Sequence, residues 1–229
     1  MYVKTIFLNG NLTEDVYMTQ PEGFVNPKHV GKICKLQKSI YGLKQASRSW
    51  NMRFDEVVKA FGFVKNVEES CVYKKVSGSA VVFLVLYVDD ILLIGNDIPM
   101  LEAVKSSLRK SFSMKDLGEA AYILGIKIYR DRSKRLIGLS QDAYIDKILN
   151  RFNMQDSKKS FLPMSHDITL SKNRCPSTPD EQERMRAIPY ALAIGSIMYA
   201  MLCTCPDVSY ALSVTSRYQS DYVKLIGQL

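Results

Sequence analysis

Two adjacent carboxylates, Asp89 and Asp90, are the side chains in this sequence whose type and setting most clearly suggest chemistry. The preceding run, Val81–Val88, is rich in β-branched and aromatic residues, which predicts a buried strand, and Ile91–Ile94 predicts the returning strand of a hairpin. Acids seldom lie against apolar strands unless a cation or a proton transfer compensates their charge. The pair therefore predicts a metal or proton-transfer site at the tip of a hairpin, although Asp is also common in ordinary surface turns.

Three helices are expected to accompany this hairpin. The first spans Ser47–Phe61 and carries Trp50 on its apolar face, and the others span Asp97–Phe112 and Ser140–Phe152. Because the neighbours of Trp50 on its face are all apolar, we predict that this side chain is a core anchor and not a platform for stacked bases. The pattern as a whole predicts an α+β fold with an antiparallel sheet and packed helices.

Strand signals become fewer in the second half of the chain. Tyr122–Tyr129 predicts a strand that Gly125 interrupts, because glycine within a strand often marks a bulge or a close approach by another backbone. Asn153–Arg186 predicts a linker, in which His166 is expected to be a solvated loop residue. Tyr190–Leu202 then predicts a further helix that contains several small residues.

The composition is that of a folded, basic protein. Its 229 residues include 31 Lys+Arg against 23 Asp+Glu, a net charge of +8, which favours a polyanionic partner such as nucleic acid, although charge balance alone is a weak argument. Five cysteines without a Cys-x-x-Cys pair, and only two histidines, argue against a structural zinc site. Reduced thiols and the lack of a signal-peptide pattern predict a cytoplasmic or nuclear protein that is not secreted. No apolar run approaches the roughly 20 residues of a membrane span, so no membrane partner is expected.

The string Tyr87–Asp90, which follows an apolar strand, resembles the catalytic hairpin of reverse transcriptases. That string alone would be a weak signal, but further blocks follow the order of the Ty1/copia-type retrotransposon polymerase. These blocks are Val3–Gly10, Val16–Phe24, Ser39–Arg48, Asp116–Glu119, Tyr122–Ile126 and Leu139–Ile145. The chain is therefore similar to a copia-type reverse-transcriptase domain from residue 1 to about residue 218.

The resemblance implies a reverse-transcriptase-like palm with partial fingers, a helical thumb and a partial connection segment. Residues 1–130 would form the incomplete fingers and palm, 131–186 the thumb-like segment and linker, and 187–229 the helical part of the connection. It also implies a domain truncated at both ends, and residues 219–229 follow no convincing pattern.

Members of this family make DNA on an RNA template by two-metal phosphoryl transfer. The resemblance implies that Asp89 and Asp90 are catalytic and bind Mg²⁺, together with a third Asp from a neighbouring strand. The family string is Met-Asp-Val-Lys-Thr, whereas this chain begins with Met-Tyr-Val-Lys-Thr, so Tyr2 occupies the third ligand position. A neutral phenol cannot bridge two cations as a carboxylate does. We therefore expect a catalytically defective copy.

Other family positions have matches in this chain. Phe7 matches the aromatic residue that excludes a ribose 2′-hydroxyl, although a core phenylalanine is an equally good interpretation. Tyr41, Gly42 and Lys44 match residues that line the nucleotide and template pocket, and Leu124-Gly125 matches the primer grip. The partners implied are an RNA or DNA template–primer duplex and deoxynucleoside triphosphates. Two alternatives remain open at this point: a non-catalytic basic module that binds nucleic acid, and an inert remnant of a retroelement.

Overall fold

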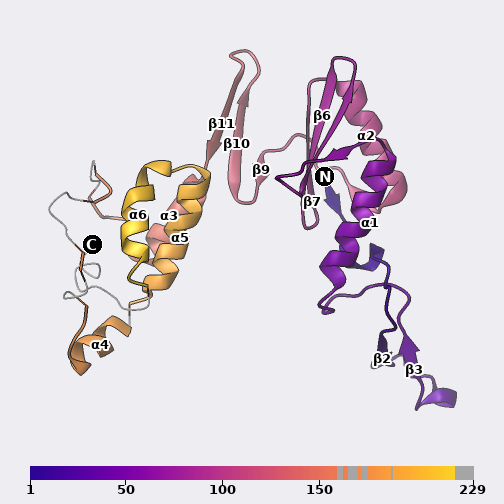
Figure 1. The fold of residues 1–229 in the computed structure, drawn as a ribbon, viewed down its shortest axis with the longest axis horizontal. Coiled ribbons are helices and arrows are strands. Elements are labelled where there is room, and N and C mark those ends of the chain that lie inside the picture. Colours follow the sequence, from indigo (N-terminus) through magenta and orange to yellow (C-terminus); the bar gives the residue numbers. More distant parts are fainter. Residues whose placement is uncertain (159–161, 165–169, 172–174, 187, 220–229) are drawn as a thin grey trace. The chain divides into compact units, whose positions relative to one another are not determined.

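A computed structural model describes residues 1–158, 162–164, 170–171, 175–186 and 188–219 (Figure 1). The chain divides into two compact units, Met1–Glu119 and Ala120–Leu229. Both combine helices with antiparallel strands, which confirms the predicted mixed fold. The division into palm, thumb and connection segments concerns roles in the family and stays a prediction. His166 and residues 220–229 lie outside the described residues.

A six-stranded antiparallel sheet is the centre of the first unit. In spatial order its strands are β4 (Val64–Lys65), β5 (Val72–Ser77), β6 (Ala80–Tyr87), β7 (Asp90–Gly95), β1 (Tyr2–Val3) and β8 (Met114–Lys115). Side chains alternate between the two faces of a strand, and in β6 Val82, Leu84 and Leu86 are the buried set. One face of the sheet is therefore directed to the core, and the other carries partly exposed residues such as Phe83 and Tyr87.

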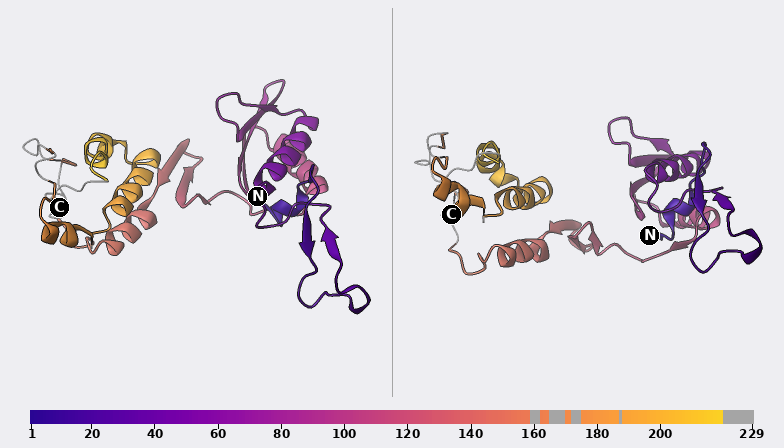
Figure 2. Two further views of the ribbon diagram at one scale, coloured as in Figure 1. Left: turned by 60° about the horizontal axis from the view of Figure 1, so that its bottom comes forward. Right: turned by 90° about the horizontal axis from the view of Figure 1, so that it is seen from below.

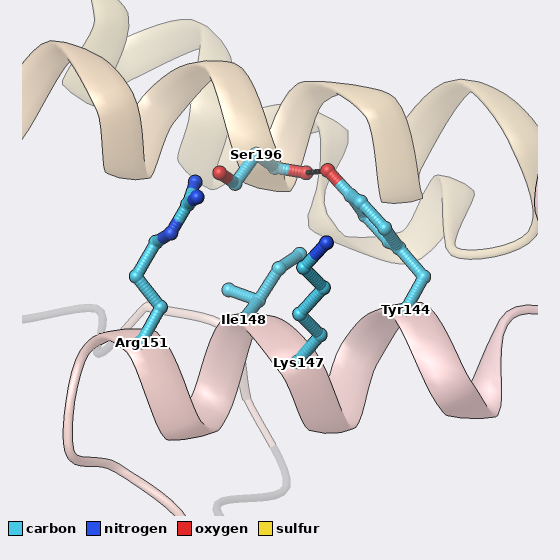
Figure 3. Close-up of a pocket in the computed structure, with 5 residues that line it drawn as sticks. All are labelled: Tyr144, Lys147, Ile148, Arg151 and Ser196. Carbon is cyan, nitrogen blue, oxygen red and sulfur yellow. Dashed lines mark hydrogen bonds between the residues drawn. The ribbon is translucent and has the colours of Figure 1, made fainter.

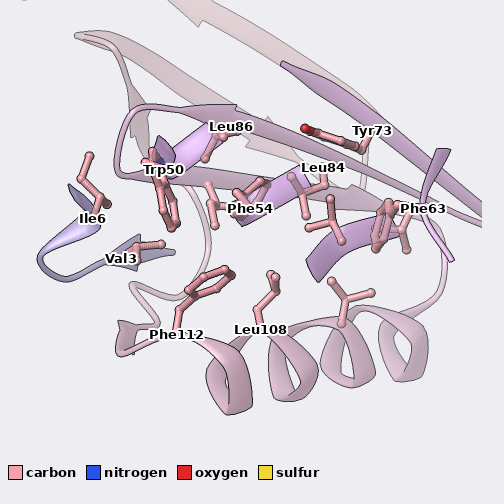
Figure 4. Close-up of a cluster of buried hydrophobic side chains, with 14 residues drawn as sticks. Val3, Ile6, Trp50, Phe54, Phe63, Tyr73, Leu84, Leu86, Leu108 and Phe112 are labelled. Carbon is pink, nitrogen blue, oxygen red and sulfur yellow. The ribbon is translucent and has the colours of Figure 1, made fainter. Parts of the chain in front are cut away.

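Two amphipathic helices, α1 (Ala46–Ala60) and α2 (Ile98–Ser111), contribute the other half of this core (Figure 4). Both lie close to their predicted ranges. Asp97 caps α2, because its side chain accepts a hydrogen bond of 2.7 Å from the Met100 amide. Trp50 is only 2% exposed, which confirms that it is a core anchor. The buried cluster consists of Val3, Ile6, Trp50, Phe54, Val58, Phe63, Tyr73, Val82, Leu84, Leu86, Ile91, Val104, Leu108 and Phe112.

A two-stranded ribbon projects from this unit, as Figure 2 shows. The ribbon pairs β2 (Tyr17–Thr19) with β3 (Ile33–Lys35). A short 3-10 helix, η1 (Ile6–Asn9), precedes it in the chain, and a second 3-10 helix, η2 (Pro27–His29), lies between the two strands in sequence. The ribbon adds little to the core, since most of its side chains are exposed.

The second unit combines a small sheet with helices. Its strands are β9 (Tyr122–Ile123), β10 (Ile126–Asp131) and β11 (Leu136–Ser140), in the spatial order β11–β10–β9. Its helices are α3 (Asp142–Arg151), α4 (Pro179–Arg186), α5 (Tyr190–Cys203), the 3-10 turn η4 (Pro206–Val208) and α6 (Ser209–Ser216). None of the described helices is by itself long and apolar enough to cross a membrane. Only α4 and α5 taken together, as a bent pair, have sufficient length and apolar composition, and this is weak support for a span.

The single strand predicted for Tyr122–Tyr129 is wrong. Leu124 and Gly125 have φ values of 51° and 77°, and β9 and β10 pair antiparallel on either side of them. Two successive left-handed residues are the backbone of a tight hairpin turn. Gly125 thus marks a reversal of the chain and not a bulge within one strand.

Candidate active site

The Asp89–Asp90 pair lies where β6 meets β7, as the hairpin prediction required. Asp89 is in the two-residue turn, and Asp90 is the first residue of β7 and pairs with Tyr87 across the hairpin. Val88, the other turn residue, has a left-handed backbone with φ 53°, which is unfavourable for a β-branched side chain. Asp89 is therefore held on a short, strained turn, and Asp90 directly follows it at the start of a well-packed strand.

Strand β1 positions Tyr2 next to these carboxylates. Tyr2 is the register partner of Asp90 in the antiparallel β1–β7 pair. The Val3 amide donates a hydrogen bond of 2.9 Å to the Asp89 carbonyl, so the backbone of β1 also holds the turn. The sequence motif predicted only that Tyr2 occupies the position of a family acid; the pairing shows that Tyr2 lies beside Asp90.

The polar residues of this site share the solvent-directed face of the sheet. Val3 and Ile91, which follow Tyr2 and Asp90 on their strands, are both buried, so side-chain alternation directs Tyr2 and Asp90 to the opposite face. The row that results across four strands is Tyr87, Asp90, Tyr2 and Lys115. The position of Lys115 opposite Tyr2 was not predicted, because β8 is short and pairs with a strand more than 100 residues earlier.

Tyr2 is a neutral donor in this setting. The negative charge of Asp89 is the main cause that raises the pKa of the Tyr2 phenol, and partial burial and the charges of neighbouring groups add to it. A phenol whose pKa lies above its ordinary value of about 10 stays protonated at neutral pH. It therefore brings no negative charge to the site.

The donor set does not fit a pair of Mg²⁺ ions. Mg²⁺ requires oxygen ligands in tight octahedral geometry, and two such ions about 4 Å apart need several carboxylates. Here two carboxylates and one neutral phenol are present. Across the described part of the chain, no group of three or more His, Cys, Asp or Glu side chains could hold a metal ion.

The residues that match the nucleotide pocket lie partly together. The rings of Phe7 and Tyr41 are in edge contact, with centroids 4.8 Å apart. Phe7 is half-buried and also packs against the core, so both interpretations of this residue retain support. Gly42 has φ 93°, a left-handed conformation that favours glycine, and Lys44 follows it in the loop before α1.

One hydrogen bond at this site had no signal in the sequence. The Trp50 indole donates to the Val88 carbonyl over 2.8 Å, which links α1 directly to the carboxylate turn. An apolar stripe at helical spacing identifies Trp50 as buried, but it does not reveal where the N–H points.

Comparison with known proteins identifies the family of this chain. A family profile described as reverse transcriptase (RNA-dependent DNA polymerase) matches residues 1–166. The chain belongs to this reverse transcriptase family. No solved structure matches it.

Several transposon proteins resemble this reverse-transcriptase domain over nearly all of its length. It is 48% identical over 219 residues to the retrovirus-related Pol polyprotein from transposon TNT 1-94 of Nicotiana tabacum, and 37% identical over 216 residues to that from transposon RE1 of Arabidopsis thaliana. It is 31% identical over 218 residues to the putative transposon Ty5-1 protein of Saccharomyces cerevisiae. These matches cover 94%, 94% and 95% of the chain, but 16%, 14% and 68% of the relatives. The chain is thus a copia-type reverse-transcriptase domain that spans a small part of the Pol polyproteins it resembles.

The second unit of the reverse-transcriptase domain contains Leu124 and Gly125, the residues predicted for the primer grip. Leu124 and Gly125 form the β9–β10 turn, and the Tyr199 hydroxyl donates to the Leu124 carbonyl. A small pocket of about 100 Å³ lies between α3 and α5. Figure 3 shows Lys147 and Arg151 projecting from α3 toward α5, where the Tyr144 hydroxyl donates to the Ser196 carbonyl over 3.1 Å.

Proposed function

We propose that this domain is a catalytically impaired copy of an RNA-directed DNA polymerase. The pairing of Tyr2 with Asp90 supports the proposal, because the matching family position carries the third carboxylate. Two-metal phosphoryl transfer depends on carboxylates that hold both cations. A phenol kept neutral by the charge of Asp89 does not replace one.

The remaining family roles follow from the same proposal. The six-stranded sheet would be the palm, the β2–β3 ribbon a part of the fingers, and α3 a thumb helix. Phe7, Tyr41, Gly42 and Lys44 would meet the incoming deoxynucleotide and the template, and Leu124-Gly125 the primer end. The partners would be a template–primer duplex and deoxynucleoside triphosphates, in the cytoplasm or nucleus.

Primer extension on an RNA template, with Mg²⁺ or Mn²⁺, tests the proposal directly. We expect almost no extension by the unmodified chain and a gain of about 100-fold or more for Tyr2→Asp, which corresponds to roughly 2.7 kcal/mol of transition-state stabilisation. Tyr2→Phe is the matched control, since it removes the hydroxyl without adding a charge, and should gain nothing. Robust extension by the unmodified chain would contradict the proposed impairment.

Two further measurements separate the possible causes of inactivity. Addition of Asp90→Asn to the Tyr2→Asp variant should abolish the gain, because the restored carboxylate acts only with its neighbours. Binding of the template–primer duplex, measured in parallel, shows whether an inactive variant has lost its substrate. Tight duplex binding without any extension by Tyr2→Asp would show that Tyr2 is not the decisive defect.

A second candidate function is a non-catalytic module that binds nucleic acid. The net charge of +8 favours it, as does a concentration of exposed cations at the β10–β11 turn, namely Arg130, Arg132, Lys134 and Arg135. Affinity that comes from phosphate contacts falls steeply with salt, because binding releases counterions. The affinity for nucleic acid should therefore fall by roughly a factor of 10³ between 50 and 200 mM salt. It should remain unchanged in a double variant that combines Asp89→Asn with Asp90→Asn. Binding that ignores salt would argue against this function.

A further inference from the structure

The single tryptophan of the chain is bonded to the carboxylate turn. Trp50 is almost completely buried, yet its indole N–H donates to the Val88 carbonyl over 2.8 Å. Val88 immediately precedes Asp89 and Asp90. A side chain that the sequence identifies only as a core residue thus contacts the backbone that carries both acids.

The turn makes two such backbone contacts. Val88 holds a left-handed conformation, φ 53°, that a β-branched residue adopts only when its surroundings impose it. Its side chain is 50% exposed and therefore supplies little packing. The two carbonyls of the turn are each bonded to another element: the Val88 carbonyl to α1 through Trp50, and the Asp89 carbonyl to β1 through the Val3 amide.

The direction of the Trp50 indole is itself fixed by packing. Its ring contacts those of Phe54 and Phe112, with centroids 5.4 Å and 5.2 Å away (Figure 4). On the backbone side, a Cβ added to Gly10 would lie 2.8 Å from Ser49 Cβ and 3.0 Å from the Trp50 nitrogen. Only glycine therefore allows the segment after η1 to approach the first turns of α1 this closely. The indole therefore has ring partners on α1 and at the end of α2, in addition to its bond to the turn.

We propose that Trp50 is a positioning residue for the Asp89–Asp90 turn. Its N–H holds the Val88 carbonyl, which keeps the turn in its left-handed conformation and sets the two carboxylates against Tyr2 of β1. The structural part of this inference stands alone. Its consequence for catalysis rests on the proposed function.

Amide hydrogen exchange of Trp50→Phe tests the structural part, because phenylalanine keeps an aromatic ring and removes the N–H. The Val3 amide bonds to the Asp89 carbonyl, and the Ile91 amide bonds to the Met1 carbonyl just before β1. We expect these two amides to exchange at least ten times faster relative to the amides of Leu84 and Val104. Phe112→Leu is the matched control: it removes packing from the same cluster and should change all four amides together. An unchanged ratio in Trp50→Phe would overturn the proposal.

A second measurement needs no core substitution. In the unmodified chain the only indole N–H signal belongs to Trp50. If it bonds to Val88 as proposed, its exchange should be as slow as that of the β6–β7 amides. Rapid exchange of this proton in the folded chain would also overturn the proposal.

The catalytic consequence is tested in the Tyr2→Asp background. There, Trp50→Phe should lower kcat by about ten-fold and change KM less than two-fold, because the turn carries groups that act in the transition state. An equal loss in Phe112→Leu would assign the effect to packing and contradict the positioning role. Inactivity of Tyr2→Asp itself would count against the proposed function, while the exchange measurements still decide the role of Trp50.

Discussion

Tyr2 and Asp90 are register partners on adjacent strands, and both are directed to the solvent side of the six-stranded sheet. A substitution from Asp to Tyr at this position leaves the backbone pairing of β1 intact, since strand hydrogen bonds do not depend on the side chain. It also adds no bulk to the core, because Tyr2 is exposed. An exchange of Asp and Tyr at position 2 is therefore expected to alter the chemistry of the site much more than the stability of the fold.

The pKa of the Tyr2 phenol should respond to removal of the neighbouring carboxylate charges. Because the charge of Asp89 is the largest cause of the raised pKa, Asp89→Asn should lower the pKa of Tyr2 toward its ordinary value. Asp90→Asn should have a smaller effect in the same direction, since Asp90 contributes least among the groups that act on Tyr2. The measurement is a pH titration of ¹³C-labelled tyrosine rings by NMR, with Tyr2→Phe to assign the signal. A pKa that does not respond to Asp89→Asn would contradict the described geometry.

The β9–β10 turn should be sensitive to side chains that disfavour a left-handed backbone. Gly125→Ala should destabilise the chain by about 1 kcal/mol, because φ is 77° there. Leu124→Asn should stabilise it by up to about 1 kcal/mol, since Asn tolerates the φ of 51° better than Leu does. Both values can be measured by denaturant unfolding of the full chain.

The neighbouring strand offers a matched control for that experiment. Among the described residues, the nearest atoms to a Cβ at Gly138 in β11 belong to Tyr129, at 3.7 Å and 3.8 Å, which is ordinary contact. Gly138→Ala should therefore change the free energy of unfolding less than Gly125→Ala. Equal losses for both alanine variants would show that left-handed backbone at residue 125 is not the cause.

Local patterns predicted the central hairpin and the two long helices of the first unit. The apolar runs on both sides of Asp89 gave the hairpin, and helical spacing gave α1 and α2 to within a few residues. The failure at Tyr122–Tyr129 has a physical reason: Leu124 carries no preference for a left-handed turn, so only Gly125 marked the position, and a lone glycine equally suits a bulge. Short strands such as β4 and β8 were missed, because two residues carry no periodicity.

The site could be predicted only in part. The motif identified Asp89, Asp90 and the unusual Tyr2, which are matters of residue type. The row that places Lys115 opposite Tyr2 and the bond from Trp50 to the turn depend on tertiary pairing between distant segments. No local periodicity encodes such contacts.

The carboxylate of Asp55 should make the stability of the fold depend on pH. It accepts a hydrogen bond of 3.0 Å from the buried Tyr73 hydroxyl of β5, which joins α1 to the sheet. It also pairs at 2.6 Å with Lys59 on its own helix. Burial raises the pKa of Asp55, but the bonds from Lys59 and Tyr73 and the charges of Lys59 and Lys65 outweigh it, so the pKa lies below its ordinary value. A carboxyl with a depressed folded-state pKa stabilises the fold above its unfolded pKa, about 4, and loses this contribution as pH falls through the folded value.

Asp55→Asn should therefore lower the free energy of unfolding by about 1–2 kcal/mol at pH 7. The difference from the unmodified chain should shrink as pH falls below about 4, because the carboxyl of the unmodified protein then becomes protonated as well. Glu56→Gln is the control on the same helix. Within the described residues its exposed carboxylate pairs only with Arg53, at 3.4 Å, so its removal should change stability by less than about 0.5 kcal/mol. Denaturant unfolding at a series of pH values gives both quantities. A loss in Asp55→Asn that stays constant from pH 7 to pH 2 would show that Asp55 acts through shape and not through its charge.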